Sequence, residues 1–377
     1  MKNLKFFEAV ALLIGTIMGA GYLGIPYVVS RVGFLIGSVI IIGLGLLLML
    51  QYLAIAEVSL RTTARHQIAG YVSKYLGRRW RLAIDFLIVL EAYGVLLAYA
   101  IGEGEVLSQV FGLSPRLLSL LFFAVVAAVI YVGLRLVEKA ELLLTFLSGS
   151  VIIIIALVAL PTFRFENLNA FGEFALLPAY GVILFSFLGG AAVPEMRQIL
   201  RGQEPLLRPA IIVGTLVPIG IYLLFTLAVL GVTGTATTPI ATVGLGNALG
   251  PGMRVAGNLL AATTMTTAFL ALGLVLKDSF RFDMRFRKSH AFLLTIGGPL
   301  ALLLIGLTDF IEILLIVGAV FGGLQGFILV RTWWRARLSG DRHPEIQFAH
   351  PRFYGIILSA VFLIGVIYTL LDIGGHL

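Results

Sequence analysis

The chain has 377 residues, of which 59% are hydrophobic and 12% are charged, and its mean hydropathy is +1.04. Soluble domains carry about 25% charged residues, so this composition excludes an ordinary soluble protein and predicts an integral membrane protein. The chain contains no cysteine, which excludes disulfides, thiolate metal sites and a cysteine nucleophile.

Hydrophobic segments long enough to cross a membrane recur along the whole sequence. A helix needs about 20 apolar residues to cross the hydrocarbon core. We expect the first segment to be retained, because Met1–Glu8 is too short and too acidic at its end for a signal peptide. The pattern predicts an all-α membrane protein with eleven transmembrane helices, at residues 7–29, 34–60, 82–110, 117–134, 140–160, 175–200, 209–232, 254–276, 291–307, 310–330 and 353–371.

The positive charges are distributed unevenly between the predicted loops. If the N-terminus is cytoplasmic, 23 of the 27 lysines and arginines lie on the cytoplasmic side, and the exceptions are Arg31, Arg116, Arg164 and Arg254. This split follows the positive-inside rule, and the odd number of spans then places the C-terminus outside. The net charge of +8 therefore indicates topology, and we expect no nucleic-acid partner.

Two of the predicted spans are interrupted by glycine and proline near mid-membrane depth. The first interruption runs from Gly15 to Pro26, and the second runs from Phe185 to Glu195. Glycine and proline both weaken a helix, and unpaired backbone groups persist in a membrane only where protein buries them or where they line a cavity. Breaks at corresponding places in two halves of a chain predict the substrate site of a secondary transporter.

The spans can be arranged as two five-helix halves of opposite orientation. Residues 7–160 form the first half and residues 175–330 form the second, so that the interrupted spans one and six correspond. The span at 353–371 is then an extra C-terminal helix, and residues 1–377 form a single transmembrane domain. We expect a small-molecule substrate, a lipid bilayer around the protein and a location in the cell membrane.

Several motifs resemble the amino acid–polyamine–organocation transporter superfamily. The run from Gly15 to Gly21, followed by Ile25-Pro26, is similar to the first-helix signature of that superfamily. Three further phrases resemble its amino acid/auxin permease branch, which includes bacterial aromatic amino acid permeases: Glu57–Thr62, Phe185–Gly190 and Thr266–Gly273. The resemblance implies a leucine-transporter-type 5+5 inverted repeat with broken helices 1 and 6, and transport by alternating access.

The chemistry of the breaks supports a site for an amino acid. A helix break leaves free N–H groups and a positive dipole end, which suit a carboxylate. We expect the substrate to contact the small or aromatic residues at the two breaks: Gly19, Ala20, Gly21, Tyr22, Ser186, Phe187, Gly189 and Gly190. Carbonyls exposed at Gly15, Met18, Ser186 and Phe187 can bind a cation or an ammonium group. Alternatively, the glycines only allow close helix packing, which is the interpretation we prefer for Gly43 and Gly45.

The resemblance also implies a cation site. Sodium-coupled relatives use a pair of hydroxyl residues on span eight, and Thr266-Thr267, with Thr263 one turn earlier, matches that pattern. Alternatively, these threonines bond back to carbonyls of their own helix. Some proton-coupled relatives place a lysine in span five, and here Lys139 lies only at its end. We therefore expect Na⁺ coupling ahead of H⁺ coupling, and no other cofactor.

Five acidic residues near or within the spans need separate interpretations. Glu91 lies deep in span three, either as a functional carboxyl or as a hydrogen bond between helices. Glu195 is a candidate for a cytoplasmic gate with a nearby arginine. We expect Glu57 to form a surface pair with Arg61, and Glu103 and Glu105 to lie near the outer surface in contact with water.

The sequence contains no set of residues typical of an enzyme. We find neither a His-Glu-x-x-His nor a Gly-x-Ser-x-Gly motif, and no paired membrane aspartates. The prediction is a symporter for a neutral amino acid, with aromatic and aliphatic side chains both left open. Alternatives are an H⁺-coupled symporter or exchanger, and a sensor built on a transporter fold.

Overall fold

The computed structural model describes residues 2–133, 149–150, 152–169 and 175–374, and all secondary structure in these ranges is helical. The α-helices are α1 (Lys2–Ile17), α2 (Ile25–Val32), α3 (Phe34–Leu60), α4 (Ile68–Leu76), α5 (Arg78–Phe111), α6 (Pro115–Val132), α8 (Glu166–Asn169), α9 (Leu176–Ser186), α10 (Ala192–Ile199), α11 (Leu207–Thr233), α12 (Ala241–Leu249), α13 (Pro251–Asp278), α14 (Lys288–Ile305), α15 (Phe310–Ile316), α16 (Gly323–Ser339) and α17 (Pro351–Ile373). Shorter 3-10 or π-helical segments are η1 (Ala20–Gly24), η2 (Leu160–Thr162), η3 (Glu204–Leu206), η4 (Gly234–Ala236), η5 (Ser279–Asp283) and η6 (Val317–Gly322).

Most of the predicted spans coincide with helices that can cross a membrane. Eight helical stretches in the described ranges are long and apolar enough, and a bent pair, Leu4–Ile17 with Ala20–Val32, makes a ninth. The two parts of that pair meet at 47°. The eight are Phe34–Leu60, Arg78–Phe111, Pro115–Val132, Glu204–Ala236, Pro251–Phe282, Lys288–Ile305, Phe310–Ser339 and Pro351–Ile373.

Two predicted spans do not appear as single long helices. The span predicted at 140–160 falls largely outside the described residues, whose apolar helix there is Ile152–Thr162. The span predicted at 175–200 consists of α9 and α10, which are separated by residues 187–191. The predicted total of eleven spans therefore stays a prediction.

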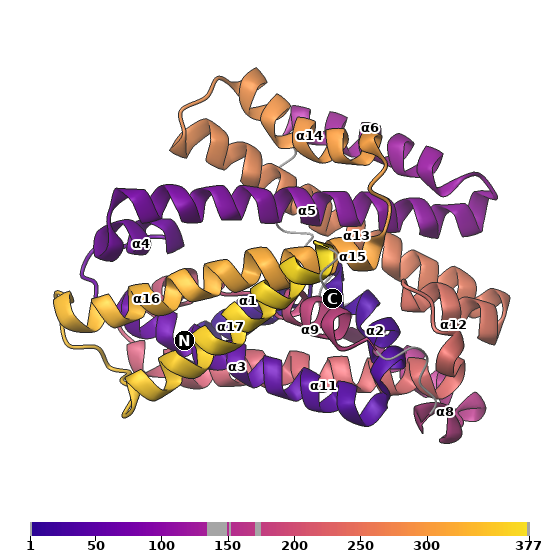
Figure 1. Cartoon of the computed structure of the whole chain (residues 1–377), viewed down its shortest axis with the longest axis horizontal. Coiled ribbons are helices and arrows are strands. Elements are labelled where there is room, and N and C mark those ends of the chain that lie inside the picture. Colours follow the sequence, from indigo (N-terminus) through magenta and orange to yellow (C-terminus); the bar gives the residue numbers. More distant parts are fainter. Residues whose placement is uncertain (1, 134–148, 151, 170–174, 375–377) are drawn as a thin grey trace.

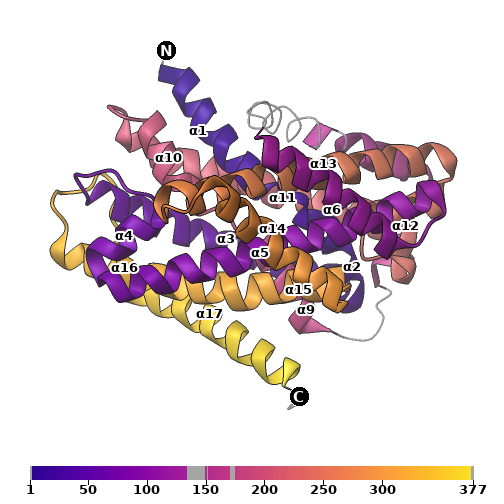
Figure 2. The same cartoon turned by 90° about the horizontal axis from the view of Figure 1, so that it is seen from above.

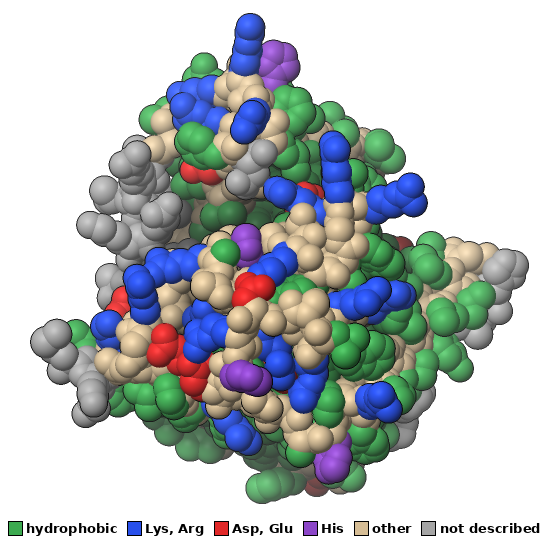
Figure 3. Space-filling view, turned by 90° about the vertical axis from the view of Figure 1, so that its left-hand side faces the viewer, with side chains coloured by type: hydrophobic (Ala, Val, Ile, Leu, Met, Phe, Trp, Pro, Cys, Tyr) green, Lys and Arg blue, Asp and Glu red, His purple; other side chains and the backbone are tan. Residues whose placement is uncertain are grey.

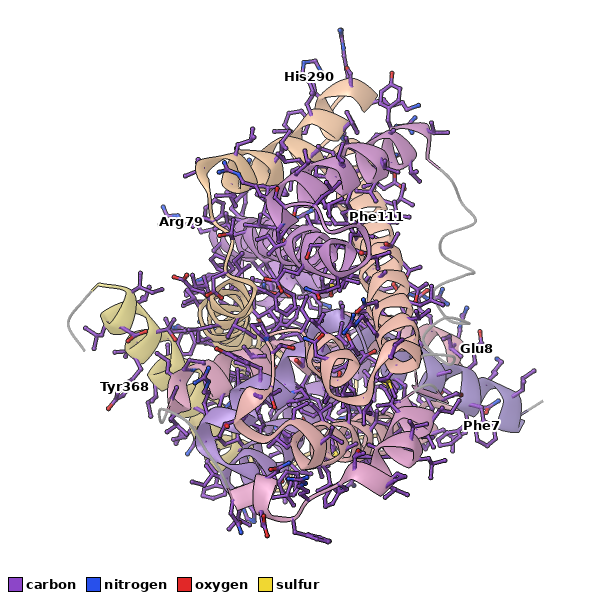
Figure 4. All side chains as sticks on the ribbon, turned by 90° about the vertical axis from the view of Figure 1, so that its right-hand side faces the viewer. Phe7, Glu8, Arg79, Phe111, His290 and Tyr368 are labelled. Atoms are coloured by element: carbon purple, nitrogen blue, oxygen red, sulfur yellow. The ribbon has the colours of Figure 1, made fainter. Side chains whose placement is uncertain are left out.

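The long helices run side by side and surround the two interrupted segments (Figure 1). Helix α5 packs against α6 and α13, and α11 packs against α3 and α1. Figure 2 shows that α1 runs outward from the body of the protein toward its N-terminus. Its Phe7, which is 64% exposed, projects from the side of the molecule (Figure 4), as expected for a helix that contacts lipid.

Lysine and arginine side chains gather at one end of the molecule, hereafter the basic end (Figure 3). This end carries α4 and the segments 61–67 and 340–350, whereas α12 lies at the opposite end together with the first turns of α6 and α13 (Figure 1). Arg116 and Arg254, two of the predicted exceptions, belong to those first turns. The charge separation predicted from sequence is therefore present, and the assignment of the basic end to the cytoplasm stays a prediction.

The long segment between α11 and α13 contains the short helix α12, which packs on α13, α11, α2 and η1. Because η1 lies within the first interrupted segment, α12 covers that segment from the end opposite to the basic one.

Glu57 corrects the sequence analysis, because its carboxylate is fully buried instead of forming a surface pair. It accepts hydrogen bonds from Arg61 Nε (2.9 Å), Trp333 Nε1 (2.8 Å) and Arg337 Nη1 (3.1 Å). Trp333 and Arg337 lie on α16, so the carboxylate joins α3 to α16. The prediction of a surface pair failed because the spacing between Glu57 and Arg61 shows a local contact but not the distant helix that covers it.

The loop after α16 is tied to the same region. The N–H groups of Asp341 and Arg342 donate to the Arg61 carbonyl at 2.8 and 3.3 Å. The Asp341 carboxylate accepts hydrogen bonds from Lys74 and from the N–H of Thr63. These donors, Lys74 first, hold the pKa of Asp341 below its ordinary value. The segments 61–67 and 340–342 therefore form one connected surface at the basic end.

We expect Glu57→Ala to lower the free energy of unfolding by about 3–5 kcal/mol. The substitution leaves the positive charges of Arg61 and Arg337 in a buried place with no carboxylate to balance them. Unfolding in mixed detergent micelles measures this change. The control is Glu345→Ala, which removes an ion pair of partly exposed side chains with Arg342 and should change stability by less than about 1 kcal/mol. Equal stability of Glu57→Ala and wild type would contradict the role of Glu57.

Candidate functional site

The first helix break lies between α1 and η1. Helix α1 ends at Ile17, Gly19 is extended (φ −68°, ψ −169°), and the chain turns helical again at Ala20. Ala20, Gly21 and Tyr22 are buried. The first N–H groups of a helix have no partner within that helix, and Gly19 has no side chain to cap them. The break therefore presents a positive dipole end inside the protein.

The second helix break lies directly beside the first. Helix α9 ends at Ser186, and α10 begins at Ala192. A Cβ atom at Gly189 would lie 2.7 Å from the Ile17 side chain, and one at Gly21 would lie 2.6 Å from the Phe185 ring and 2.9 Å from Ser186 Oγ. The glycines therefore let the two breaks touch, so in part they have the packing role that was the alternative interpretation.

Two tyrosines hold the carbonyls at the ends of α1 and α9. The Tyr222 hydroxyl on α11 lies 2.9 Å from the carbonyl oxygens of both Ile17 and Ser186. The Tyr52 hydroxyl on α3 donates to the Phe187 carbonyl. The sequence alone predicts no role for either tyrosine. Their phenol groups supply donors to backbone groups that the breaks leave without helical partners.

Aromatic rings surround this junction. Tyr22 stacks on Tyr222 with ring centroids 6.1 Å apart, Phe187 lies 4.9 Å from Tyr222, and Phe225 contacts Tyr22 edge-on at 5.3 Å. All four rings are fully buried. Tyr99 on α5 also reaches the first break, because its hydroxyl would lie 3.2 Å from a Cβ atom at Gly19.

Gly43 and Gly45 of α3, for which close packing is the preferred interpretation, have different surroundings. A Cβ atom at Gly45 would lie 2.5 Å from Ile219, as expected for close packing, whereas nothing lies within 4 Å of one at Gly43. Tyr93, another aromatic residue of α5, packs away from the breaks, where its hydroxyl donates to the Leu294 carbonyl at 2.6 Å.

The threonines of α13 divide between two kinds of contact. Thr263 and Thr267 donate to carbonyls of their own helix, at 2.7 Å to Leu259 and 2.8 Å to Thr263, as the alternative interpretation expected. The Thr266 hydroxyl instead donates to the Glu103 carboxylate on α5. A hydroxyl that donates still has lone pairs for a cation. Gly15 lies within α1 and Met18 in the break itself.

Glu103 corrects a second interpretation, because it is 1% exposed instead of in contact with water. Its hydroxyl partner Thr266 and the contact of Gly102 with Met265 place it between α5 and α13. Proximity to the end of a span indicates exposure only where no other helix covers that face, and here α13 covers this face of α5. Glu105 is partly buried and lies near Asp309.

The two acids singled out for coupling or gating have neutral partners. Glu91 accepts a hydrogen bond from Gln325 on α16. Glu195 on α10 accepts one from Gln67 at 3.4 Å, while Arg197 of the same helix donates to the Thr62 carbonyl at 2.9 Å. Helix α10 is therefore attached to the segment 61–67 at the basic end.

A cleft of about 210 Å³ opens between α10 and the segment 61–67. Its lining is mostly polar and includes Arg65, His66, Arg197, Arg201 and Arg342. This cleft is lined partly by α10, the helix that follows the second break, so its walls must shift if α10 moves.

Comparison with known proteins identifies the family. The model of the tryptophan/tyrosine permease family matches residues 2–371. The chain belongs to that family. Tyrosine-specific transport system 1 of Haemophilus influenzae is 24% identical, over 97% of this chain and 96% of its own length. Glutamine transporter 2 of Aliivibrio fischeri is 25% identical over 61% of each chain.

Solved structures show the fold of this permease. The structure of MhsT in complex with L-phenylalanine matches with a TM-score of 0.65 at 16% identity and covers 98% of both chains. The inward-facing conformation of Mhp1 matches with a TM-score of 0.67 at 12% identity, over 97% of this chain and 88% of its own. The permease therefore has the leucine-transporter-type architecture, and it is a transporter and not an enzyme.

We expect Gly19→Ala to raise the half-saturating substrate concentration about tenfold, which corresponds to about 1.4 kcal/mol. The new methyl group would stand at the break, 3.2 Å from the Tyr99 hydroxyl, and the backbone angles of Gly19 suit alanine. Substrate binding to the purified permease measures the change. The control is Gly43→Ala, whose methyl group meets no atom within 4 Å. Unchanged affinity in Gly19→Ala would exclude Gly19 from the substrate site.

We expect Tyr222→Phe to lower the free energy of unfolding by about 1–3 kcal/mol, because it removes a donor from two buried carbonyls while the ring remains. Micellar unfolding tests the change. Tyr368→Phe, at a position that is 54% exposed (Figure 4), is the matched control and should behave as wild type. A Tyr222→Phe variant as stable as this control would show that the hydroxyl does not hold the breaks together.

Proposed function

We propose that this permease is a secondary active symporter that carries a neutral aromatic amino acid, tyrosine or tryptophan, across the cell membrane by alternating access. The observation that carries the proposal is the contact between two helix breaks inside an apolar bundle. The N–H groups of Ala20 and Gly21 precede the first hydrogen bond of η1 and suit the substrate carboxylate, and the remaining members of the site are Gly19, Tyr22, Ser186, Phe187, Gly189 and Gly190.

The aromatic lining favours an aromatic substrate. Tyr22, Phe187, Tyr222 and Phe225 gather around the breaks, and aromatic rings pack well on one another at centroid distances of about 4.5–7 Å. The family description and the tyrosine-specific relative point the same way. A substrate ring that enters this cluster requires some of these buried rings to rotate.

For the membrane topology we propose eleven spans, with inverted repeats at about 7–160 and 175–330 and an extra helix at 353–371. The basic end faces the cytoplasm, so the N-terminus is cytoplasmic and the C-terminus is outside. Helix α1 runs outward toward its N-terminus, and α12 packs on η1 from the end opposite to the basic one. Both features support a substrate path that leads toward the basic end.

For the coupling ion we propose Na⁺, bound near the first break by oxygen ligands that include Thr263, Thr266 and Thr267 with carbonyls of Gly15 and Met18. Support comes from α13 itself, which packs on η1 and whose Thr264 hydroxyl faces Tyr22, so the proposed ligands lie on a helix that contacts the first break. A proton is the second candidate, because Glu91 and Glu103 are carboxyl groups within spanning helices.

The decisive experiment is uptake of labelled tyrosine, tryptophan, leucine and glutamine into proteoliposomes, with inward Na⁺ and H⁺ gradients imposed separately. We expect accumulation of tyrosine or tryptophan driven by the Na⁺ gradient. Accumulation driven by the H⁺ gradient alone would show that the coupling ion is H⁺ and not Na⁺. Binding of an amino acid without uptake or exchange would contradict transport and indicate a sensor. Empty liposomes and the Gly43→Ala permease serve as controls.

A further inference from the structure

Glu103 is a buried carboxylate to which the described part of the chain gives no positively charged partner. It is 1% exposed, and the partner observed for it is the neutral hydroxyl of Thr266. Among the residues that the structure describes, no lysine, arginine or histidine lies within 4.0 Å of its oxygens. A carboxylate within a spanning helix is costly unless a cation accompanies it or it takes a proton, so Glu103 marks a functional site.

The charged groups on the neighbouring elements are engaged elsewhere or lie at the ends of the bundle. Glu105 of the same helix interacts with Asp309 before α15, and Arg116 of α6 donates to the Leu304 carbonyl at 3.1 Å. On α13, Arg254 belongs to the first turn, and Lys277, in the last turn, donates to the Ile130 carbonyl at the end of α6. None of these side chains supplies a counter-charge to Glu103.

The position of Glu103 connects it to the substrate-binding break. Tyr99, one helical turn earlier on the same face of α5, places its hydroxyl beside Gly19. On the other side, Thr266 shares one face of α13 with Thr263 and Thr267, and all three are partly exposed. A cation that follows this hydroxyl-bearing face reaches Thr266 and meets the Glu103 carboxylate, which lies one helical turn along α5 from Tyr99.

We propose that Glu103 and Thr266 are ligands of a monovalent metal cation, Na⁺, and that the carboxylate supplies the negative charge of the coupling site. Carboxylate and hydroxyl oxygens are hard ligands suited to such an ion. This inference rests on the proposed Na⁺ symport and adds to it an acidic ligand from α5, a helix outside the set from which the site was predicted.

The test measures Na⁺ binding without transport. The melting temperature of the detergent-purified permease, free of amino acid, is recorded against Na⁺ concentration, with choline keeping the ionic strength constant. We expect Na⁺ to stabilise the wild type, and Glu103→Gln to raise the half-maximal Na⁺ concentration at least tenfold. Thr266→Val, which keeps the shape of the side chain, should raise it in the same direction. Glu105→Gln, two residues away, is the matched control and should not change it.

Three outcomes would overturn the proposal. An unchanged Na⁺ response in both Glu103→Gln and Thr266→Val would remove these residues from the cation site; Thr266→Val decides alone if Glu103→Gln does not fold. An equal loss in Glu105→Gln would show a general charge effect. A wild type that responds to acidification and not to Na⁺ would assign the carboxyl to a proton. Because no amino acid is present, failure of the permease to take up tyrosine would refute the proposed transport without altering this result.

Discussion

Backbone groups that are freed inside an apolar bundle must find hydrogen-bond partners, and the interrupted helices of this permease depend on that requirement. At the carbonyl ends of α1 and α9, two phenol groups meet it, with Tyr222 placed between Ile17 and Ser186 and Tyr52 on Phe187. At the N–H end of the second break, Ala192 and Val193 donate to the carbonyls of Gly189 and Gly190 at 3.1 and 3.2 Å, whereas no side chain caps η1 at Gly19. The carbonyl ends of α1 and α9 are thus held by tyrosines, and the positive end of η1 stays available for an anionic group.

This arrangement needs close approach as well as hydrogen bonds. Helix α9 lies so near the π-helical segment η6 that a Cβ atom at Gly318 would stand 2.0 Å from the Gly181 carbonyl oxygen. Gly21 and Gly189 bring the breaks themselves into contact in the same way. Small residues let backbones pack where lipid offers no hydrophobic driving force between helices. The aromatic rings then fill the space around the two breaks, so the same rings pack the helices together and line the junction.

The sequence was informative about the breaks and less so about what holds them. Clusters of glycine and proline in apolar runs weaken a helix wherever they occur, so both interruptions could be located. Tyr52 and Tyr222 could not be identified, because a tyrosine in an apolar helix is typical of ordinary packing and its partners lie 135 and 205 residues away. The predicted exposures of Glu57 and Glu103 were wrong for the same reason. The burial of Glu57 depends on how α16 is rotated, and that of Glu103 depends on how α13 is rotated.

The acids within the spans differ in how their charge is compensated, and the difference separates structural from functional roles. Glu57 lies between two arginines and a tryptophan N–H, so its charge is balanced and its role is to join helices. Glu91 has an amide donor from Gln325, which supplies a hydrogen bond but no charge. Glu103 has a hydroxyl, and it lies one turn from the residue that touches Gly19. A carboxylate whose charge is balanced gains little from a bound cation, whereas Glu103, which no cationic side chain of the described residues balances, has the most to gain from one.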